Sequence, residues 1–313
     1  MNKKFGLIGT ITHDVITLES GQSFEGIGGV LYQVAVLCGM GREVFLYTNL
    51  GEELEPEVDK ITGAWTTLQR EGVIRVSGPG NQVHLHYPEK GERVEILKSV
   101  VPPLNPSSVL QNIRELEMLI LVINSGFDIE FSDWRKIVAA AKCPIWLDIH
   151  SLLLSRELNA PREYLPLFEW KNWIEGVSFV QANTKEVASM LGCPDKVPSD
   201  TEMSHYGKMA FDVGVEAVFI TLGKEGVFVI TPQKSRKIAS PGAEKIIDTT
   251  GCGDVFCGTV AVKTAEGSDP FTAASFGLKL ATKAVEVKGI KETYILIREN
   301  SKKVKKGKGN EKA

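Results

Sequence analysis

The sequence predicts an α/β fold: a doubly wound, mostly parallel sheet with helices on both faces, and a small β-sheet lid. Short apolar runs alternate with amphipathic stretches of helix length along most of the chain. This alternation implies βαβ units, whose crossover helices cover both faces of a parallel sheet. Two regions rich in glycine and alternating β-formers, at about 13–28 and 73–98, interrupt the rhythm and read as small antiparallel strands inserted as the lid.

The expected elements follow from hydrophobic pattern and length. The strands are apolar runs of four to seven residues: Phe5–Ile11, Glu43–Thr48, Leu119–Ile123, Ile145–Ile149, Val177–Val180, Val218–Leu222 and Val227–Ile230. The helices are longer amphipathic or apolar stretches: Gly29–Cys38, Phe131–Ala141, Asp254–Thr264 and Pro270–Val287. In the first helix Val30, Val34 and Leu37 fall at helical spacing, and glycines lie just past its end.

Composition excludes several classes of protein. The chain has 313 residues, of which 43% are hydrophobic and 24% charged, as in ordinary globular proteins. No apolar run approaches the ~20 residues that span a bilayer, and polar residues at 12–14 break the first apolar stretch, so we expect neither a membrane partner nor a signal peptide. The five scattered cysteines form no C-x-x-C pair, which disfavours a zinc site or disulfides and favours the cytoplasm.

Basic charge is confined to the end of the chain. The formal net charge is −3, but residues 301–313 hold six lysines and one glutamate, so the rest of the chain carries −8. A nucleic-acid-binding arm typically interleaves aromatic residues with its basic ones, and this segment has none. We therefore expect residues 299–313 to form a disordered, solvated tail, and we expect no nucleic-acid partner.

The stretch from residue 246 to 264, IIDTTGCGDVFCGTVAVKT, carries the strongest chemical signal. Gly251 and Gly253 allow backbone conformations and close ligand approaches that a side chain would forbid. The helix that follows presents free N–H groups and the positive end of its dipole, which together suit a phosphate. Asp254 lies in the first turn of that helix, either as a favourable charge at a helix N-terminus or as a general base beside an anion site.

Residues 248–256, DTTGCGDVF, resemble the DTxGAGDxF signature of the ribokinase-like (PfkB) carbohydrate kinases, with Cys252 in the alanine position. The resemblance implies a ribokinase-like kinase domain over residues 1–298, including the lid. It also implies that Asp254 is the catalytic base and that the backbone N–H groups of Gly251, Cys252 and Gly253 hold the transferring phosphate. Because a helix N-terminus lowers a thiol pKa, Cys252 is also a candidate reactive thiol.

Two further stretches resemble the family's acceptor-binding motifs. GTITHD, residues 9–14, is similar to the strand and turn in which an aspartate binds sugar hydroxyls, which implies that role for Asp14. Gly28 and Gly29 open a stretch similar to the family's GGxxxNxA motif, with Gln33 in the asparagine position. Taken alone, an aspartate in a turn also fits an ordinary side-chain contact with the backbone.

Two more stretches resemble the family's nucleotide-binding motifs. Asn183 and Glu186 match N-x-x-E, which implies that Asn183 binds ATP and that Glu186 acts on its Mg²⁺. The pattern also fits a helix cap. The segment that begins at Thr221 matches TLGxxG, which implies that Thr221, Gly223 and Gly226 bind ATP, although a glycine-bearing hairpin turn gives the same pattern.

The resemblance implies transfer of the ATP γ-phosphate to a hydroxyl of a sugar or sugar-like molecule. It further implies a need for Mg²⁺, allows a K⁺ site near Asp248, and allows a homodimer formed through the lid. A nucleoside or inositol kinase, or a non-catalytic sensor on the same fold, remains open. A dinucleotide-dependent oxidoreductase is disfavoured, because the first strand lacks G-x-G-x-x-G. Asp148, at a strand end, is a further candidate for the substrate cleft.

Overall fold

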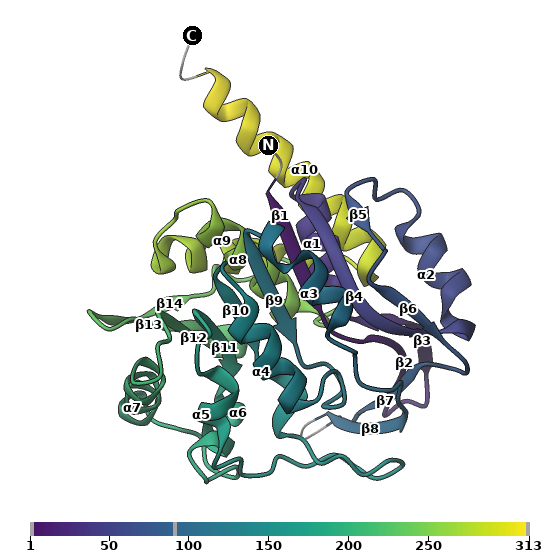
Figure 1. Ribbon diagram of the computed structural model, residues 1–313, viewed down its shortest axis with the longest axis horizontal. Helices are drawn as coiled ribbons and strands as arrows, with labels where there is room; N and C mark the ends of the chain where they lie inside the picture. The colour runs from purple at the N-terminus through teal and green to yellow at the C-terminus, as the bar shows by residue number, and fades with distance from the viewer. Residues whose placement is uncertain (1–2, 90–92, 311–313) are drawn as a thin grey trace.

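The computed structural model describes residues 3–89 and 93–310, and these form a large central sheet and a smaller one (Figure 1). The central sheet has the strand order β14-β13-β12-β11-β10-β9-β1-β4-β5, with β6 also paired to β4. Its strands are β1 (Lys4–Ile8), β4 (Glu43–Gly51), β5 (Leu68–Gln69), β6 (Val73–Val76), β9 (Met118–Val122), β10 (Ile145–Asp148), β11 (Phe179–Asn183), β12 (Ala217–Thr221), β13 (Gly226–Ile230) and β14 (Ser235–Ala239). Every pair is parallel except β12–β13 and β13–β14.

Helices cover both faces of this sheet (Figure 1). One face carries α1 (Leu31–Gly39), α2 (Glu55–Thr62), α8 (Cys252–Ala265), α9 (Pro270–Ala284) and α10 (Gly289–Asn310). The other carries α3 (Ser107–Asn112), α4 (Phe131–Ala140), α5 (Trp170–Ile174), α6 (Thr184–Met190) and α7 (Asp200–Phe211). Short 3-10 turns lie at η1 (Glu52–Leu54), η2 (Ile113–Glu115), η3 (His150–Leu153) and η4 (Gly223–Glu225). The predicted α/β class is therefore confirmed.

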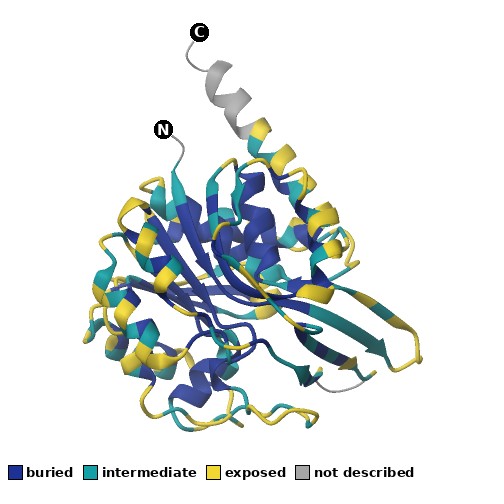
Figure 2. Ribbon diagram, turned by 45° about the vertical axis from the view of Figure 1, so that its right-hand side comes forward, coloured by how far each residue is buried: buried dark blue, intermediate teal, exposed yellow. Residues whose placement is uncertain are grey.

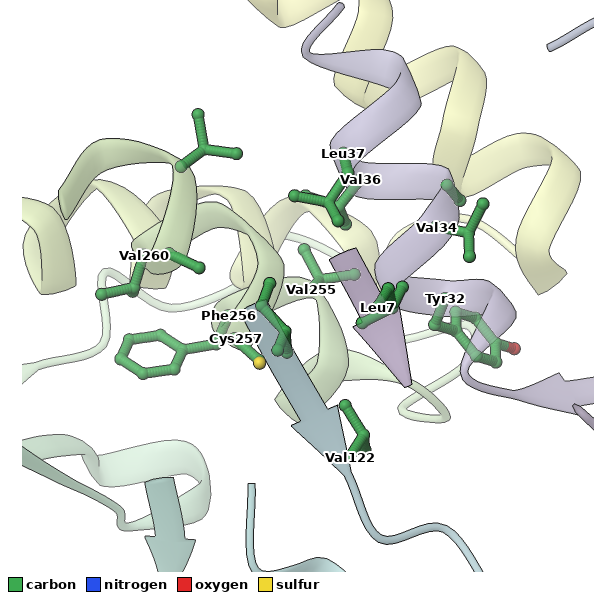
Figure 3. Close-up of a cluster of buried hydrophobic side chains, with 14 of the residues drawn as sticks. Leu7, Tyr32, Val34, Val36, Leu37, Val122, Val255, Phe256, Cys257 and Val260 are labelled. Carbon is green, nitrogen blue, oxygen red and sulfur yellow. The ribbon is translucent and has the colours of Figure 1, made fainter. Parts of the chain in front are cut away.

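The core is divided by the sheet into two apolar clusters. Along β9, Ile120 and Val122 face the cluster under α1 and α8, whereas Leu119 and Leu121 face the cluster under α4 and α6. Strands buried on both faces need apolar residues at every position, which explains why they appear as unbroken runs in the sequence. Figure 2 shows these strands as the buried centre, and Figure 3 shows side chains of β1 and β9 beside those of α1 and α8.

The smaller sheet is the predicted lid, and it lies at the lower right of Figure 1. It has the order β3-β2-β7-β8, formed by β2 (Ile11–Leu18), β3 (Ser23–Gly29), β7 (Asn81–Tyr87) and β8 (Val94–Ser99). The β2–β3 and β7–β8 pairs are antiparallel, but the central β2–β7 pair is parallel, contrary to the expected antiparallel insertion. Residues 90–92 of the expected lid segment lie outside the described residues.

Two expected strands are placed differently. The run Phe5–Ile11 divides into β1 and β2, because Gly9 packs where a Cβ would lie 2.7 Å from the side chain of Asn124, and Thr10 bonds to Asp128 through both N (3.0 Å) and Oγ1 (2.8 Å). These contacts turn the chain out of the central sheet and into the lid. The start of the second lid segment, β6, pairs with β4 and belongs to the central sheet.

The remaining expected strands and helices are present, with ends moved by at most three residues. Helix α10 continues to Asn310, into the segment from residue 299 for which a disordered tail is predicted; residues 311–313 of that segment lie outside the described part. None of the helices in the described residues combines the length and apolar character that crossing a bilayer requires.

Candidate active site

Five parallel strands, β1, β9, β10, β11 and β12, end at one edge of the central sheet, and the N-terminus of α8 meets them there. Two adjoining cavities lie at this edge. The lid cavity is lined by Thr12, Asp14, Gly29, Tyr32, Val83, Leu85, Arg93, Glu95, Asn124, His150, Thr250, Gly251 and Asp254. The edge cavity is lined by Tyr87, Arg93, Asp148, His150, Gln181, Ala182, Asn183, Glu186, Thr221, Thr249, Thr250, Gly251, Cys252, Gly253 and Asp254. Ligands of open α/β sheets bind at such carboxyl edges.

The turn that opens α8 is shaped by a side-chain hydrogen bond and by two glycines. Asp248 accepts a hydrogen bond from the Thr250 N–H at 2.8 Å, which fixes the entry to the turn. Gly251 has a φ of 75°, and a Cβ there would lie 2.4 Å from the Tyr32 ring, so only glycine fits. Gly253 is exposed in the first turn of α8, where backbone N–H groups lack intrahelical partners. Cys252 N–H is partly engaged, donating to Thr249 O at 3.4 Å.

Asp254 lies in the first turn of α8, half-buried, and lines both cavities. Its Oδ1 accepts a hydrogen bond from Gln33 Nε2. Burial raises the pKa of Asp254, and both the His150 ring and the bond from Gln33 oppose that rise. The carboxylate is therefore held in a fixed orientation with a basicity above that of an ordinary aspartate.

Gln33 was predicted to bind the acceptor, but its side chain does not line the lid cavity. It is fully buried in α1 and lines neither cavity. A glutamine is one methylene longer than the asparagine that it replaces in the motif, and its amide donates to Asp254 instead. In the described part of the chain, its Oε1 is buried without a hydrogen-bond partner.

The other predicted acceptor residues lie at the lid cavity or support it. Asp14 and Gly29 line the cavity, and burial raises the pKa of Asp14 to about 6. Gly28 does not line it. A Cβ on Gly28 would lie 2.1 Å from Asp14 Oδ2, so this glycine makes room for the Asp14 carboxylate. Gly29 has a φ of 64° and packs against the Thr10 carbonyl, where a Cβ would lie 2.3 Å away.

Asn183 and Glu186 form a complete capping box at the start of α6 and also line the edge cavity. Glu186 Oε2 accepts from Asn183 N–H at 2.7 Å, its Oε1 accepts from Asn183 Nδ2 at 2.6 Å, and its own N–H donates to Asn183 Oδ1 at 2.9 Å. Burial raises the pKa of Glu186 to about 8. The cap and a place at the cavity, which the sequence presented as alternatives, are combined in these two residues.

The TLGxxG segment places one of its three predicted residues at the site. Thr221 ends β12 and lines the edge cavity, whereas Gly223 and Gly226 line neither cavity. Gly226 has a φ of 117°, and a Cβ there would lie 2.0 Å from Ile238 O in the neighbouring strand. Its place is explained by the hairpin, which was the alternative explanation of this motif.

Several residues at the site were not predicted as site residues from the sequence. Tyr32 lies under the α8 turn, Asn124 follows β9, and Arg93 enters from the edge of β8. Gln181 Nε2 donates to Asp148 Oδ2 at 3.0 Å and to Gly253 O at 3.1 Å, so it joins β10 to the α8 turn. A position after a parallel strand was the available signal for Asn124. Arg93 had none, because the lid strands carry no motif.

His150 follows β10 and lines both cavities. Neighbouring Asp148 is buried, and burial together with the charges of Glu186 and Asp254 raises its pKa well above the ordinary value. The lowering of the Cys252 pKa expected from the helix N-terminus is not found. Burial and the charges of Asp248 and Asp254 raise the Cys252 pKa to about 12, against the effect of the helix dipole.

The described residues contain no group of three or more His, Cys, Asp or Glu side chains able to hold a metal ion among themselves. The carboxylates at the edge cavity are those of Asp148, Glu186 and Asp254. Mg²⁺ is commonly bound through one or two carboxylates, several waters and the phosphates of a substrate. This donor set therefore fits Mg²⁺ that arrives with a phosphate ligand.

Residues 163–295 match the family described as pfkB family carbohydrate kinase. Among curated proteins, the chain is 27% identical over 141 residues to the ribokinase of Staphylococcus aureus, an alignment that covers 45% of this chain and 44% of that protein. The chain spans less than half the length of the first curated relatives it matches. The family match includes β11, β12, α8 and α9, but not the lid or α1.

Solved structures extend the likeness to nearly the whole fold. Arabidopsis thaliana ribokinase, complexed with ribose and ATP, superposes with a TM-score of 0.73 at 18% identity, covering 95% of this chain and 99% of that one. A nucleoside kinase of Burkholderia thailandensis, complexed with inosine, gives a TM-score of 0.72 at 18% identity, with 96% and 98% covered. At these identities the likeness shows the shared fold.

Proposed function

We propose that this chain, a ribokinase-like member of the pfkB family, transfers the γ-phosphate of ATP to a hydroxyl of a sugar or sugar-like molecule. One observation carries the proposal. A half-buried, oriented carboxylate, Asp254, lies in the first turn of a glycine-opened helix at the junction of two cavities. A proton acceptor, an anion site and two adjoining substrate spaces are the parts that phosphoryl transfer to an alcohol requires.

In the proposed reaction, the lid cavity binds the acceptor and the edge cavity binds the phosphates of ATP. The acceptor hydroxyl oxygen attacks the γ-phosphorus, its proton passes to Asp254, and the bond from the γ-phosphorus to the bridging oxygen breaks to release ADP. The raised pKa of Asp254 supports this role, because a base is most effective when its pKa lies near the working pH. Backbone N–H groups of Gly251 and Gly253 would stabilise the phosphoryl oxygens.

Glu186, and Asp148 beside it at the edge cavity, are the residues that would hold Mg²⁺. When bound with ATP, Mg²⁺ neutralises charge on the phosphates. Both Glu186 oxygens already accept hydrogen bonds from Asn183, which supports contact through water rather than direct ligation. In the same proposal, Asn183 and Thr221 contact the nucleotide from the edge cavity.

The acceptor is proposed to be a neutral polyhydroxylated molecule held by Asp14. The lid cavity combines that carboxylate with amide and hydroxyl groups, as hydroxyl-rich ligands require. It also contains one aromatic ring, Tyr32, and the aliphatic Val83 and Leu85, surfaces on which a base could pack. A nucleoside acceptor is therefore the second candidate, and the fold shared with a nucleoside kinase supports it.

The proposed function is tested by an ATP-consumption screen of the whole chain against sugars, nucleosides and inositols, with Mg²⁺ present. We expect one acceptor class to give turnover that depends on both ATP and the acceptor. Binding of ATP and of an acceptor without any turnover across the panel would replace the kinase with the non-catalytic sensor. Binding of a nicotinamide dinucleotide instead of ATP would reject both.

A cation requirement and an assembly belong to the same proposal. Asp248 lies just before the α8 turn, and its Oδ1 accepts a hydrogen bond from Thr250 N–H at 2.8 Å. A monovalent cation site near this carboxylate is tested by comparing turnover in K⁺, Na⁺ and a bulky organic cation. A homodimer through the lid is tested by analytical ultracentrifugation of the whole chain.

A further inference from the structure

Five residues line both cavities, and they mark the boundary that a transferring phosphoryl group would cross. Thr250, Gly251 and Asp254 belong to the α8 turn and its first helical residues. The other two, Arg93 and His150, come from elsewhere: Arg93 from the edge of the lid and His150 from the end of β10. Segments distant in sequence thus bring two basic side chains to the same boundary.

The charges around the cavities are unequal. The acidic side chains lining one or both cavities are those of Asp14, Glu95, Asp148, Glu186 and Asp254. Among the described residues, Arg93 and His150 are the only basic side chains that line either cavity. A polyphosphate entering this ring of carboxylates needs positive charge, and the protein offers it at the boundary between the two cavities.

We propose that Arg93 and His150 are catalytic residues that together stabilise the phosphoryl group in transit between the two cavities. The inference rests on the proposed function and adds two residues to it. In the transition state, negative charge spreads over the three equatorial oxygens of the γ-phosphoryl group while the acceptor proton passes to Asp254 and ADP departs. Donors fixed where that charge develops accelerate the step more than they strengthen substrate binding.

Arg93 is only partly paired by its nearest carboxylate, Glu95. Its Nη2 lies 3.3 Å from Glu95 Oε2, but the other oxygen of Glu95 pairs with Arg162 Nη1 at 2.9 Å. The Arg162 side chain is fully buried and also donates to the backbone oxygens of Ser125 and Ser155. Because Glu95 is shared by two guanidinium groups, it neutralises Arg93 only in part, and the charge of Arg93 also acts on Asp14 and Asp254 beside the boundary.

The same contacts attach the lid to the body of the protein. Glu95 belongs to β8 of the lid, whereas Arg162 belongs to a loop of the body, and Arg162 N–H also donates to Glu95 O at 2.8 Å. Arg93 lies two residues before Glu95, so the attachment of β8 to the body holds the Arg93 guanidinium at the boundary.

His150 is held at the boundary by a backbone that a histidine rarely adopts. Its φ is 37°, in the left-handed region, and the described contacts of its ring include Nδ1 to Ser151 Oγ at 2.9 Å. Such backbone persists where the surroundings determine it, and it clusters at functional sites. The bond to Ser151 fixes the orientation of the ring. Because Nδ1 is engaged in that bond, Nε2 is the ring nitrogen left to bond a ligand in the cavities.

The test compares Arg93→Leu and His150→Asn with the unaltered chain, using the best acceptor from the screen. Asparagine tolerates the left-handed backbone of residue 150 and removes the imidazole. We expect kcat to fall by about 10²-fold for Arg93→Leu and somewhat less for His150→Asn, the scale of one lost charge-stabilising donor. The KM for ATP and the KM for the acceptor should change little. In both variants, the affinity for ADP with aluminium fluoride, Mg²⁺ and the acceptor should fall more than the affinity for ADP alone.

Matched controls are Arg75→Leu and His86→Asn, both outside the cavities. Arg75 lies on β6 with its side chain 72% exposed, and His86 lies on β7 of the lid. Both should keep the turnover of the unaltered chain. If His150→Asn does not fold, Arg93→Leu decides alone, with Arg93→Lys expected to recover part of kcat.

Two results would overturn the proposal. Unchanged kcat in both variants would remove them from the transfer step, and a raised acceptor KM with normal kcat would make them acceptor-binding residues. Failure of the unaltered chain to phosphorylate anything in the panel would reject the proposed function instead. An inactive unaltered chain thus rejects the proposed function, whereas an active unaltered chain with unaffected variants rejects only the roles of Arg93 and His150.

Discussion

The two sides of the site differ in how they are built. The proposed phosphate side, formed by β11, β12 and α8, lies within residues 163–295 that match the pfkB family, and it depends on backbone geometry such as the left-handed Gly251. The proposed acceptor side, formed by α1 and the lid, lies outside that match and depends on side chains such as Asp14 and Arg93. The family match thus covers one side of the site and not the other.

The difference follows from the chemistry of the two ligands. A phosphate is bound by N–H groups of a turn, and such a turn tolerates few sequences because its glycines cannot be replaced. A hydroxyl-rich acceptor is bound by side chains, which can change type while the strands that present them keep their shape. Gln33 is an example. Helix α1 is retained, but a glutamine stands in the asparagine position of the motif, and its side-chain amide donates a hydrogen bond to Asp254.

The largest effect is expected on the phosphate side, at Asp254. We expect Asp254→Asn to lower kcat by about 10²–10⁴-fold, since the amide cannot accept the acceptor proton. ATP affinity, measured by calorimetry, should change far less. Near-normal turnover would contradict the assignment of Asp254 as the base. It would also contradict the proposal that the phosphate side supplies the proton acceptor.

The next effect tests the contact between the two sides. Gly251→Ala places a Cβ against the Tyr32 ring at a left-handed φ, and we expect a loss of about 2–4 kcal/mol in the free energy of unfolding, from backbone strain and crowding together. Denaturant titration measures it. In the Tyr32→Ala background the crowding should disappear and only the backbone cost remain, so equal losses in both backgrounds would contradict the contact.

A smaller effect separates the two roles of Glu186. Glutamine is also found at the third position of a capping box, so Glu186→Gln should keep the bond from Asn183 N–H and preserve α6, while the bond from Asn183 Nδ2 is lost. The Mg²⁺ concentration for half-maximal turnover should rise on the order of tenfold, as when an outer-shell partner of a metal is lost. An unchanged Mg²⁺ requirement would leave Glu186 as a cap alone.

The pH dependence of stability supplies the control for this variant. Burial raises the pKa of Glu186 from 4.5 to about 8, so the folded protein binds a proton there that the unfolded chain has lost. This contribution to stability is complete below the unfolded pKa and declines as pH rises toward 8. Glu186→Gln should therefore show a weaker decline in stability between pH 5 and 8 than the unaltered chain.

The smallest effect sharpens the role of Gln33 on the acceptor side. Its hydrogen bond favours the ionised form of Asp254, so Gln33→Leu should raise the pKa of that carboxyl. Because the base acts when ionised, the acidic limb of the kcat/KM profile should move to higher pH, with the plateau and the acceptor KM little changed. A raised acceptor KM without a shifted limb would restore the acceptor-binding role predicted from the motif.

Much of the fold was predictable because buried parallel strands are continuous apolar runs. Boundaries were less predictable where tertiary contacts decide them: the division at Gly9 depends on Asn124 and Asp128, which are distant in sequence. The parallel β2–β7 pair escaped prediction for the same reason, since the connection between these strands passes through α1 and β4. Local pattern does not encode such a crossover.

At the site, the residues of the α8 turn were predictable because glycines and an aspartate leave a fixed spacing. Roles that depend on the length of a side chain were not predictable. Gln33 fits an acceptor motif by its position, but its side chain is long enough to hydrogen-bond Asp254. Thiol acidity at Cys252 was predicted from the helix dipole alone, and burial beside two aspartates reverses it. Arg93 and His150 become visible only when lid, strand end and turn are assembled.

The packing of α10 on α1 has a consequence for synthesis. Ile297 of α10 is fully buried, with Gly39 of α1 so near that an added Cβ would lie 3.0 Å from it, and Tyr294 stacks on Trp65 at 4.9 Å. A nascent chain therefore carries α1 with the face that meets α10 uncovered, from the synthesis of α1 until α10 has left the ribosome. At ordinary elongation rates that interval lasts on the order of ten seconds or more, long enough for chaperones to engage it.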